Sequence, residues 1–352
     1  MIEGMMKQLI ECVPNYSEGR DRSVIEAIVA AISSVEGVTL LHVDPGEGAN
    51  RTVVTFVGEP GPVCEAAFRG AREAQARIDM RRHHGTHPRI GATDVLPLVP
   101  VSGITLEECA VLARSLAGRL YDELGIPCYC YEAAAFKPGR KNLAVCRAGE
   151  YESLPEKMAD PLRRPDFCGV YDETAARSGA SCVGARNYLI AVNFNLNSTS
   201  VDQAMDIACA VREKGRIVPG TQDWIRGTLP GCKAIGWFIE EYGIAQVSMN
   251  ITDIGRTPLH VAYEEVCRAA SARGLRVTGT EIIGLVPKRV LLEAGRYFLE
   301  RRNRPADIPE PEVVREAVEA MGLSDLRPFI PAEKVIEYRM ESVERRKEST
   351  HA

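Results

Sequence analysis

The same order of strands and helices occurs twice along this chain, and this repetition constrains the fold more than any other feature. Each half has the pattern of apolar residues expected for β-α-β-β-α-β. In the first half, strands are predicted at residues 9–13, 38–43, 51–57 and 95–101, and helices at 24–34 and 63–82. In the second half, strands are predicted at 188–196, 232–239, 245–251 and 281–286, and helices at 200–214 and 258–273. The pattern predicts an α/β protein of two ferredoxin-like βαββαβ subdomains, side by side with a cleft between them.

The elements beyond this pattern place the domain boundaries. A helix at 105–124 and a strand at 128–131 extend the first half, and a helix at 287–301 extends the second. Between the halves, from about residue 149 to residue 184, lies a glycine-rich, basic loop region. We therefore predict an N-terminal subdomain at residues 1–180, a C-terminal subdomain at 181–304, and a helix with a charged tail at 305–352. Ligands often bind where two domains meet.

Composition excludes several classes of protein. A length of 352 residues suits two domains, and a net charge of −5 with a pI of about 5.8 argues against nucleic acid as a partner. No apolar run approaches the roughly 20 residues that span a bilayer, and the first residues lack a signal-peptide pattern. We therefore expect a cytoplasmic protein with no membrane partner. The 11 cysteines are scattered, so reduced and mostly buried thiols are expected.

Common cofactor and nucleophile motifs are missing from the sequence. There is no P-loop, no G-x-G-x-x-G opening a helix, and no G-x-S-x-G elbow. ATP, dinucleotide cofactors and α/β-hydrolase chemistry are therefore not expected.

The segment RRHHGTHPRIGA (residues 81–92) contains three of the six histidines. Proline cannot continue a helix and pushes the preceding residue out of the helical region, so His87, just before Pro88, is predicted to lie on a loop. A loop imidazole among arginines suits a general base.

Two other interpretations of this segment stay open. His83 and His87 are four residues apart, which makes a zinc-binding face on a continuous helix, but Gly85 interrupts that helix. Alternatively, the histidines and arginines cap the carbonyl groups of a helix end and face water.

Asp44 ends a predicted strand, and Arg51 begins the next one. A carboxylate and a guanidinium are therefore expected at one edge of the sheet, where Asp44 would orient an imidazole and Arg51 would bind a substrate carboxylate. The alternative is an ordinary turn closed by an ion pair.

Asn193 and Asn195 alternate with apolar residues along a strand of the second half, and Ser248 and Asn250 do the same on another strand. Alternation places the amides on one polar face. Asn193, Asn195 and Asn250 are therefore candidate substrate-binding residues, although a face exposed only to water would show the same pattern.

Several segments together resemble the glutamate formimidoyltransferase family, the formiminotransferases of histidine degradation. They are ECVPNYSEG (11–19), NRT (50–52), IDMRRHHGTHPRIGA (78–92), RAGEYE (147–152), GAR (184–186) and IGLVP (283–287). The similarity extends over almost the whole chain, from about residue 8 to residue 338.

This resemblance implies a fold, a reaction and a site. The family has two α/β subdomains, is commonly dimeric, and transfers the formimidoyl group of N-formimino-L-glutamate to N5 of tetrahydrofolate, its co-substrate, without a metal. Its catalytic histidine and strand-end aspartate correspond to His87 and Asp44. In animals the transferase is fused to a cyclodeaminase, so here a separate cyclodeaminase partner is expected.

The resemblance also implies a folate-binding loop at residues 168–179. The residues carried over are Cys168, Gly169, Val170, Tyr171, Arg177, Ser178 and Gly179. The sequence departs from the family pattern Asp-Phe-Gly-Pro, which here reads Asp166-Phe167-Cys168-Gly169.

The implied chemistry fits the residues. Neutral His87 would take the proton of N5 in a tetrahedral intermediate, and Asp44 would hold the tautomer of the imidazole and stabilise positive charge. Arg51 or Arg89 would bind a carboxylate of glutamate. Basic residues suited to the anionic tail of folate are Lys137, Arg140, Arg163 and Arg164.

Other functions remain as alternatives. A metal-dependent amidine hydrolase would use His83 and His87 as ligands, and a non-catalytic folate-binding protein would tolerate the loss of His87. Within transferases, glycine instead of glutamate, or formyl instead of formimidoyl, is an open choice.

Overall fold

The computed structural model describes residues 8–218 and 220–342, and the chain divides into two compact units, Met1–Asn187 and Tyr188–Ala352. Each unit has its own sheet and its own apolar core. None of the described helices has the length and apolar character needed to cross a bilayer.

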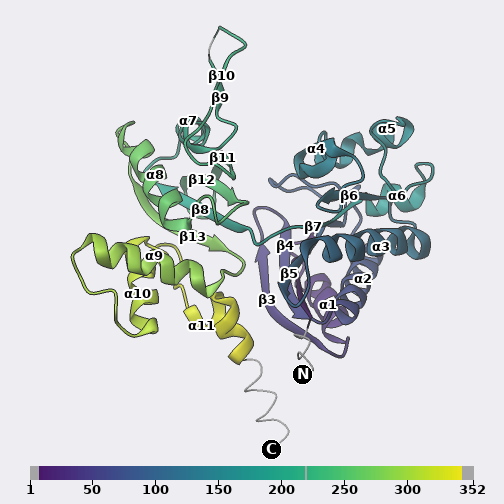
Figure 1. The fold of residues 1–352 in the computed structure, drawn as a ribbon. Helices are drawn as coiled ribbons and strands as arrows, with labels where there is room; N and C mark the ends of the chain where they lie inside the picture. The colour runs from purple at the N-terminus through teal and green to yellow at the C-terminus, as the bar shows by residue number, and fades with distance from the viewer. Residues whose placement is uncertain (1–7, 219, 343–352) are drawn as a thin grey trace, which may run out of the picture. The chain divides into compact units, whose positions relative to one another are not determined.

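The first unit is built on the predicted β-α-β-β-α-β order (Figure 1). Its strands lie in the order β3-β4-β1-β5, and each neighbouring pair is antiparallel. The short strand β2 pairs with both β4 and β5. The elements are β1 (Leu9–Cys12), β2 (Asn15–Tyr16), α1 (Arg22–Ser33), β3 (Val38–Gly46), β4 (Arg51–Gly58), α2 (Pro60–Arg77) and β5 (Thr93–Ser102). This strand order is that of a ferredoxin-like fold.

Three further elements extend the first unit, and two of them are strands that widen its sheet. They are α3 (Leu106–Leu124), β6 (Cys128–Glu132) and β7 (Ser181–Ala185), and the two strands continue the sheet in parallel beside β5, in the order β5-β7-β6. Because β7 belongs to this sheet, the first unit extends past the predicted boundary at residue 180. The sequence pattern did not show that the chain returns to this sheet at β7, because a long basic loop region separates β7 from the earlier strands.

Alternating side chains of these strands build two cores, one on each face. Cys128 and Cys130 of β6 pack with α1, α2 and α3, whereas Tyr129 and Tyr131 face the opposite side. The second core is completed by short helices between β6 and β7. These are the 3₁₀ turns Pro138–Lys141 and Tyr151–Ser153, and the helices α4 (Leu143–Arg147), α5 (Leu154–Ala159) and α6 (Glu173–Ser178). A strand that is apolar on both faces is expected in a parallel sheet whose two faces are both covered.

The second unit repeats the fold with a four-stranded sheet in the order β11-β12-β8-β13, all antiparallel. Its first helix begins as predicted, because the side chain of Ser200 accepts a hydrogen bond from the Gln203 N–H at 3.3 Å. The elements are β8 (Ile190–Leu196), α7 (Val201–Val211), β11 (Cys232–Ile239), β12 (Ile244–Ile251), α8 (Leu259–Ser271) and β13 (Val277–Ile283). Between α7 and β11, the strands β9 (Arg216–Ile217) and β10 (Trp224–Ile225) form a hairpin that stands away from the rest of this unit (Figure 1).

The C-terminal helices belong to the second unit rather than to a separate tail. They are α9 (Lys288–Arg301), α10 (Glu310–Ala320) and α11 (Pro331–Lys334). Val314 and Ala317 of α10 lie in the core of this unit. The main chain of Val313 packs closely against Gly295 of α9, since a Cβ on Gly295 would lie 2.0 Å from the carbonyl oxygen of Val313. The predicted boundary at residue 305 therefore does not separate a structural unit, and the part of the predicted tail from 343 onward lies outside the described residues.

Candidate active site

His87 lies in the loop between α2 and β5, but the helix before this loop is shorter than predicted. α2 ends at Arg77 rather than at residue 82, because the buried Ile78 takes an extended conformation (φ −97°, ψ 127°). Asp79 then closes a turn, in which its carboxylate accepts hydrogen bonds from the main-chain N–H of Arg81 at 3.1 Å and from Nε of Arg81 at 2.8 Å. A local side-chain hydrogen bond of this kind competes with the helix and ends it.

The two ring nitrogens of His87 have different partners. Nδ1 lies 2.7 Å from the carbonyl oxygen of Pro88, and since a carbonyl can only accept, Nδ1 carries the hydrogen. Nε2 therefore holds the lone pair, and it accepts a hydrogen bond from Nη1 of Arg51. Burial, together with the cations of Arg51 and Arg147, lowers the pKa of His87 far below its ordinary value. His87 is thus a neutral imidazole whose basic nitrogen faces a guanidinium.

Arg51, the first residue of β4, has donor capacity to spare. Its Nε is buried and has no hydrogen-bond partner among the described residues. Burial and the neighbouring Arg147 lower the pKa of Arg51 to about 10, against the attraction of Asp94 and Asp44. A group with this pKa is still charged at neutral pH. A buried cation with an unpaired donor is a natural partner for an incoming carboxylate.

Arg147 and Asp94 form a buried ion pair beside this group. Arg147 ends α4 and donates from Nε at 3.2 Å, and from Nη2, to the carboxylate of Asp94, whose side chain is 1% exposed. The same carboxylate accepts a hydrogen bond from the Ile90 N–H at 3.0 Å. The pair therefore fixes the end of the histidine segment and places a second cation near His87.

Asp44 and Arg51 lie on adjacent strands, as predicted, and the register also places them on one face of the sheet. In the antiparallel pairing of β3 with β4, Asp44 is opposite Val53 and Arg51 is opposite Gly46, so Asp44 and Arg51 are diagonal neighbours. Asp44 attracts the charge of Arg51. The predicted role of Asp44 in holding the tautomer of His87 does not match the structure, because Pro88 already accepts the Nδ1 hydrogen.

Asn50 attaches the histidine loop to the turn between β3 and β4. Its side chain accepts a hydrogen bond from the Gly19 N–H at 3.0 Å and donates to the His84 carbonyl at 2.9 Å. Its own backbone is left-handed (φ 47°), a conformation that asparagine tolerates better than most residues. At Gly85 a Cβ would lie 2.2 Å from the Ala49 carbonyl oxygen, so only glycine allows this approach. These contacts set the position of His87 relative to Arg51.

One interpretation of the sequence expected His83 to be exposed at a helix end. In the structure His83 is buried instead. Its side chain donates from Nε2 to the main-chain oxygen of Asn50 at 2.8 Å, and its Nδ1 accepts from Nε of Arg89 at 3.4 Å. Both ring nitrogens of His83 are therefore occupied, as are those of His87. Neither offers a free lone pair for a shared zinc ion, and within the described ranges no group of three or more His, Cys, Asp or Glu side chains is arranged to hold a metal.

Arg89 was predicted as a clamp for a substrate carboxylate, and the structure gives it a different role. All of its N–H groups have partners within the first unit: two carboxylates, from Glu150 and Glu152, together with the ring and carbonyl of His83. The contact with Glu152 is bidentate, at 2.7 and 2.6 Å. Since no donor of Arg89 is left over, this residue positions the loop instead of binding substrate.

The predicted folate-binding segment divides into an exposed part and a buried part. Val170 is 82% exposed and Tyr171 37%, and Cys168 and Gly169 beside them are partly or fully exposed. Most of the remaining segment forms α6, in which the exposed Arg177 donates to the Ala76 carbonyl at 2.7 Å.

Ser178 and Gly179, at the end of α6, are buried and support the histidine segment. The Ala92 N–H bonds to the Ser178 carbonyl at 2.7 Å, and a Cβ on Gly179 would lie 2.3 Å from the Ile90 carbonyl oxygen. They serve packing, so Cys168–Tyr171 and the exposed Arg177 are the predicted folate-binding residues that remain available to a ligand.

Among the basic residues expected near the folate tail, Arg140 is buried. It forms an ion pair with Asp166 and donates to the Arg164 carbonyl at 2.5 Å. Lys137, Arg163 and Arg164 are exposed.

In the second unit, the polar face shared by two strands is present as predicted. Asn193 lies opposite Ser248 and Asn195 opposite Gln246. Asn193 donates to Glu281 at 3.1 Å, and Asn195 donates to Asp325 at 2.9 Å and accepts from Gln246 at 2.8 Å. Both of these asparagines are buried within this network, whereas Asn250 is exposed.

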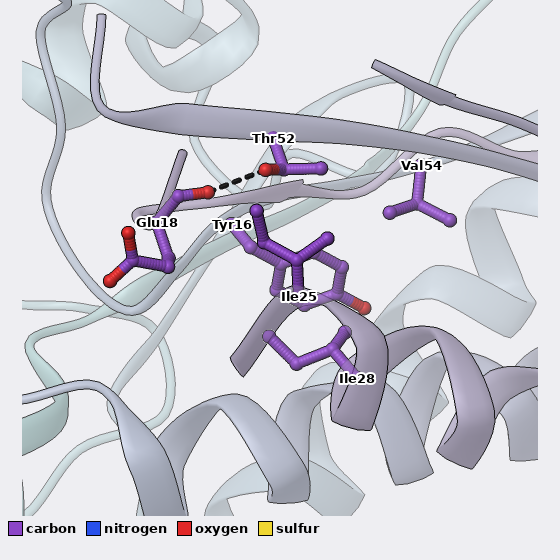
Figure 2. A pocket seen from close by; sticks show the side chains of 6 residues that line it. All are labelled: Tyr16, Glu18, Ile25, Ile28, Thr52 and Val54. Carbon is purple, nitrogen blue, oxygen red and sulfur yellow. Dashed lines mark hydrogen bonds between the residues drawn. The ribbon is translucent and has the colours of Figure 1, made fainter. Parts of the chain in front are cut away.

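A separate hollow in the first unit is not a ligand site. Figure 2 shows it between α1 and the strands β2 and β4, with the Thr52 hydroxyl donating to the Glu18 carbonyl at 2.5 Å. Its lining residues are Tyr16, Glu18, Ile25, Ile28, Thr52 and Val54. It is too small to hold a water molecule.

Comparisons with known proteins show the family of this chain. A family model described as the formiminotransferase domain, N-terminal subdomain, matches residues 9–186, and one described as the formiminotransferase domain matches residues 191–341. The chain belongs to the formiminotransferase family.

Individual members of the family are also similar in sequence. The glutamate formimidoyltransferase of Streptococcus pyogenes serotype M1 is 40% identical, covering 84% of this chain and 94% of that protein. The protein of the same name from Thermoplasma acidophilum is 40% identical over 83% of this chain and 92% of its own length. The formimidoyltransferase-cyclodeaminase of Sus scrofa is 45% identical over 95% of this chain, which spans 60% of that longer protein.

Sequence reasoning missed three residues that shape the surroundings of His87: Asn50, Asp94 and Arg147. Asn50 and Arg147 occur in segments that carry the family resemblance, NRT and RAGEYE. Those segments therefore signalled that the residues matter. The signal did not show that Arg147 pairs with a residue 53 positions earlier in the chain.

Proposed function

We propose that this protein transfers the formimidoyl group of N-formimino-L-glutamate to N5 of tetrahydrofolate, giving 5-formimidoyltetrahydrofolate and L-glutamate. The observation that carries the proposal is the neutral His87 imidazole, with its Nδ1 hydrogen held by Pro88 and its Nε2 lone pair directed at Arg51. Names and lengths of the S. pyogenes and T. acidophilum relatives support the same reaction.

His87 supplies the proton transfers that this reaction needs. N5 attacks the formimidoyl carbon, and in the tetrahedral intermediate N5 carries a proton that has become acidic. Nε2 of His87 accepts this proton, and the imidazolium returns it to the glutamate nitrogen as the bond from carbon to that nitrogen breaks. General acid–base catalysis of this kind typically contributes about 10²–10⁴-fold in rate.

The other residues bind and balance charge. Arg51 binds a carboxylate of the glutamate portion through its Nε and Nη donors, and Asp44 stabilises positive charge on this side of the site. The exposed segment Cys168–Tyr171 contacts the folate, and the exposed Lys137, Arg163 and Arg164 attract its anionic tail. Asn250 is retained as a substrate-binding residue, since it is exposed on the polar face of β12.

A steady-state assay with purified protein tests the reaction. Formation of 5-formimidoyltetrahydrofolate should require both N-formimino-L-glutamate and tetrahydrofolate, should survive removal of metals by a chelator, and should be largely lost in His87→Ala. Loss of activity on chelation, with hydrolysis in the absence of folate, would instead favour the amidine hydrolase. Folate binding without any turnover would favour the non-catalytic binding protein.

The same assay ranks the donors. N-formiminoglycine and N-formylglutamate, each compared with N-formimino-L-glutamate by kcat/KM, decide between glycine and glutamate and between formyl and formimidoyl. We also propose a cytoplasmic homodimer, as the family resemblance implies. Light scattering after size exclusion would measure the oligomeric state.

A further inference from the structure

We propose that Arg51 occupies the basic nitrogen of His87 in the free protein and that a carboxylate of the amino-acid substrate draws Arg51 away, so that substrate binding itself switches on the base. This inference rests on the proposed function, because it concerns the same imidazole. It adds a coupling between the substrate carboxylate and the protonation of His87.

The geometry of the free protein makes His87 a poor base. Its only lone pair on the ring lies on Nε2, and the Nη1 hydrogen of Arg51 is directed at that lone pair. A proton from N5 cannot reach a nitrogen that already accepts from a guanidinium. Arg51 must therefore leave this nitrogen before the transfer can proceed.

Charge around His87 points the same way. The groups that face it are Arg51 from β4 and Arg147 from α4, and both oppose an imidazolium. Asp94 is taken up by its ion pair with Arg147, and Asp44 acts on Arg51 from the neighbouring strand. An additional anion beside Arg51 is needed to offset the cations when His87 becomes charged.

The substrate carries such an anion, and Arg51 has a place for it. The buried Nε of Arg51 has no hydrogen-bond partner in the part of the chain that the structure describes, so a carboxylate can bind Nε and Nη together. This carboxylate replaces the weaker acceptor, the neutral imidazole, because hydrogen bonds between charged groups are the stronger ones. Release of Nε2 and neutralisation of Arg51 then both raise the affinity of His87 for a proton.

An NMR titration of the histidine rings tests this switch, with L-glutamate as the probe and His87→Gln to assign the signal. In the free protein, His87 should stay neutral between about pH 5 and pH 8. Saturating L-glutamate should bring its titration midpoint into that range. In Arg51→Gln the midpoint should lie in the range without glutamate and should no longer respond to it, and the affinity for glutamate should fall by about 10- to 100-fold.

Arg82→Gln is the matched control, since Arg82 is an exposed arginine of the same segment, and it should behave like the wild type. A free protein in which His87 titrates normally, or a glutamate complex in which it stays neutral, would overturn the switch. The transfer assay separates this result from the reaction itself. Normal formimidoyl transfer with an unresponsive His87 refutes only the switch, whereas absence of transfer refutes the proposed function.

Discussion

His83 donates a hydrogen bond from Nε2 to the main-chain carbonyl oxygen of Asn50, 2.8 Å away, and this bond ties the histidine segment to the turn that begins β4. Asn50 returns the contact from its side chain, which donates to the His84 carbonyl at 2.9 Å. Because Arg51 follows Asn50 directly, the same contacts position the guanidinium that faces His87. The pair of His87 and Arg51 is therefore held by a small network of hydrogen bonds on either side of it.

Asn50→Ala should loosen this network. The substitution removes the bonds to Gly19 and His84 and places alanine at a positive φ, so we expect a loss of about 1–3 kcal/mol in the free energy of unfolding and a lower kcat. Asn50→Gly relieves the backbone and should recover part of the stability but not the activity. Denaturant unfolding and steady-state kinetics on both variants would show this, and equal activity in the two and the wild type would contradict it.

Arg89→Lys should reduce stability without weakening substrate binding. A lysine cannot reproduce the bidentate contact with Glu152 or the remaining bonds to Glu150 and His83, so the loss should be about 1–3 kcal/mol, toward the lower end because Glu150 and Glu152 are partly exposed. KM for N-formimino-L-glutamate should stay near the wild-type value. A raised KM at unchanged thermal stability would restore Arg89 as the carboxylate clamp.

His87→Ala should lower kcat by about 10²–10⁴-fold, the usual contribution of a general base, with little change in folate affinity. Asp44→Asn should cost less, because Pro88 rather than Asp44 holds the Nδ1 hydrogen. His84→Ala serves as the control, since the His84 side chain is exposed. Single-turnover and steady-state rates of formimidoyl transfer would check the order. If Asp44→Asn is as damaging as His87→Ala, Asp44 must contact the imidazole during the reaction.

Stability should fall as the pH drops below about 6.5. Burial lowers the pKa of His83, His87 and His260 from the ordinary value of 6.5, so the unfolded chain binds more protons than the folded one below that pH. The stabilisation is complete above pH 6.5 and is lost at about 1.4 kcal/mol per pH unit for each histidine as the pH falls toward the folded pKa.

Denaturant unfolding between about pH 7 and pH 5 measures this slope. His83→Gln should make it shallower, whereas His84→Gln should leave it unchanged. An identical slope in wild type and His83→Gln would show that His83 binds protons equally in the folded and unfolded states, against the expected lowering of its pKa.

The sequence by itself determined the local features of this protein. The periods of the apolar residues predicted the β-α-β-β-α-β order in both units, because alternation and helical spacing are properties of short segments. Pro88 and Gly85 predicted the loop at His87 for the same reason, and the neighbouring strand ends placed Asp44 beside Arg51. The end of α2 was missed by a few residues, since the turn at Asp79 is stabilised by its own side-chain hydrogen bonds, which compete with continuation of the helix.

Only the tertiary structure decided which of two arginines, Arg51 or Arg89, has a hydrogen-bond donor left for a ligand. Arg51 and Arg89 look alike in the sequence, each next to a motif residue. Arg89 is bound by Glu150 and Glu152, more than 60 positions away, and by His83, whereas the Nε of Arg51 has no hydrogen-bond partner among the described residues. Likewise, β7 returns to the first sheet and α10 covers the second core through contacts between distant segments. Such pairings depend on how strands and loops come together in space, and no local pattern of residues records them.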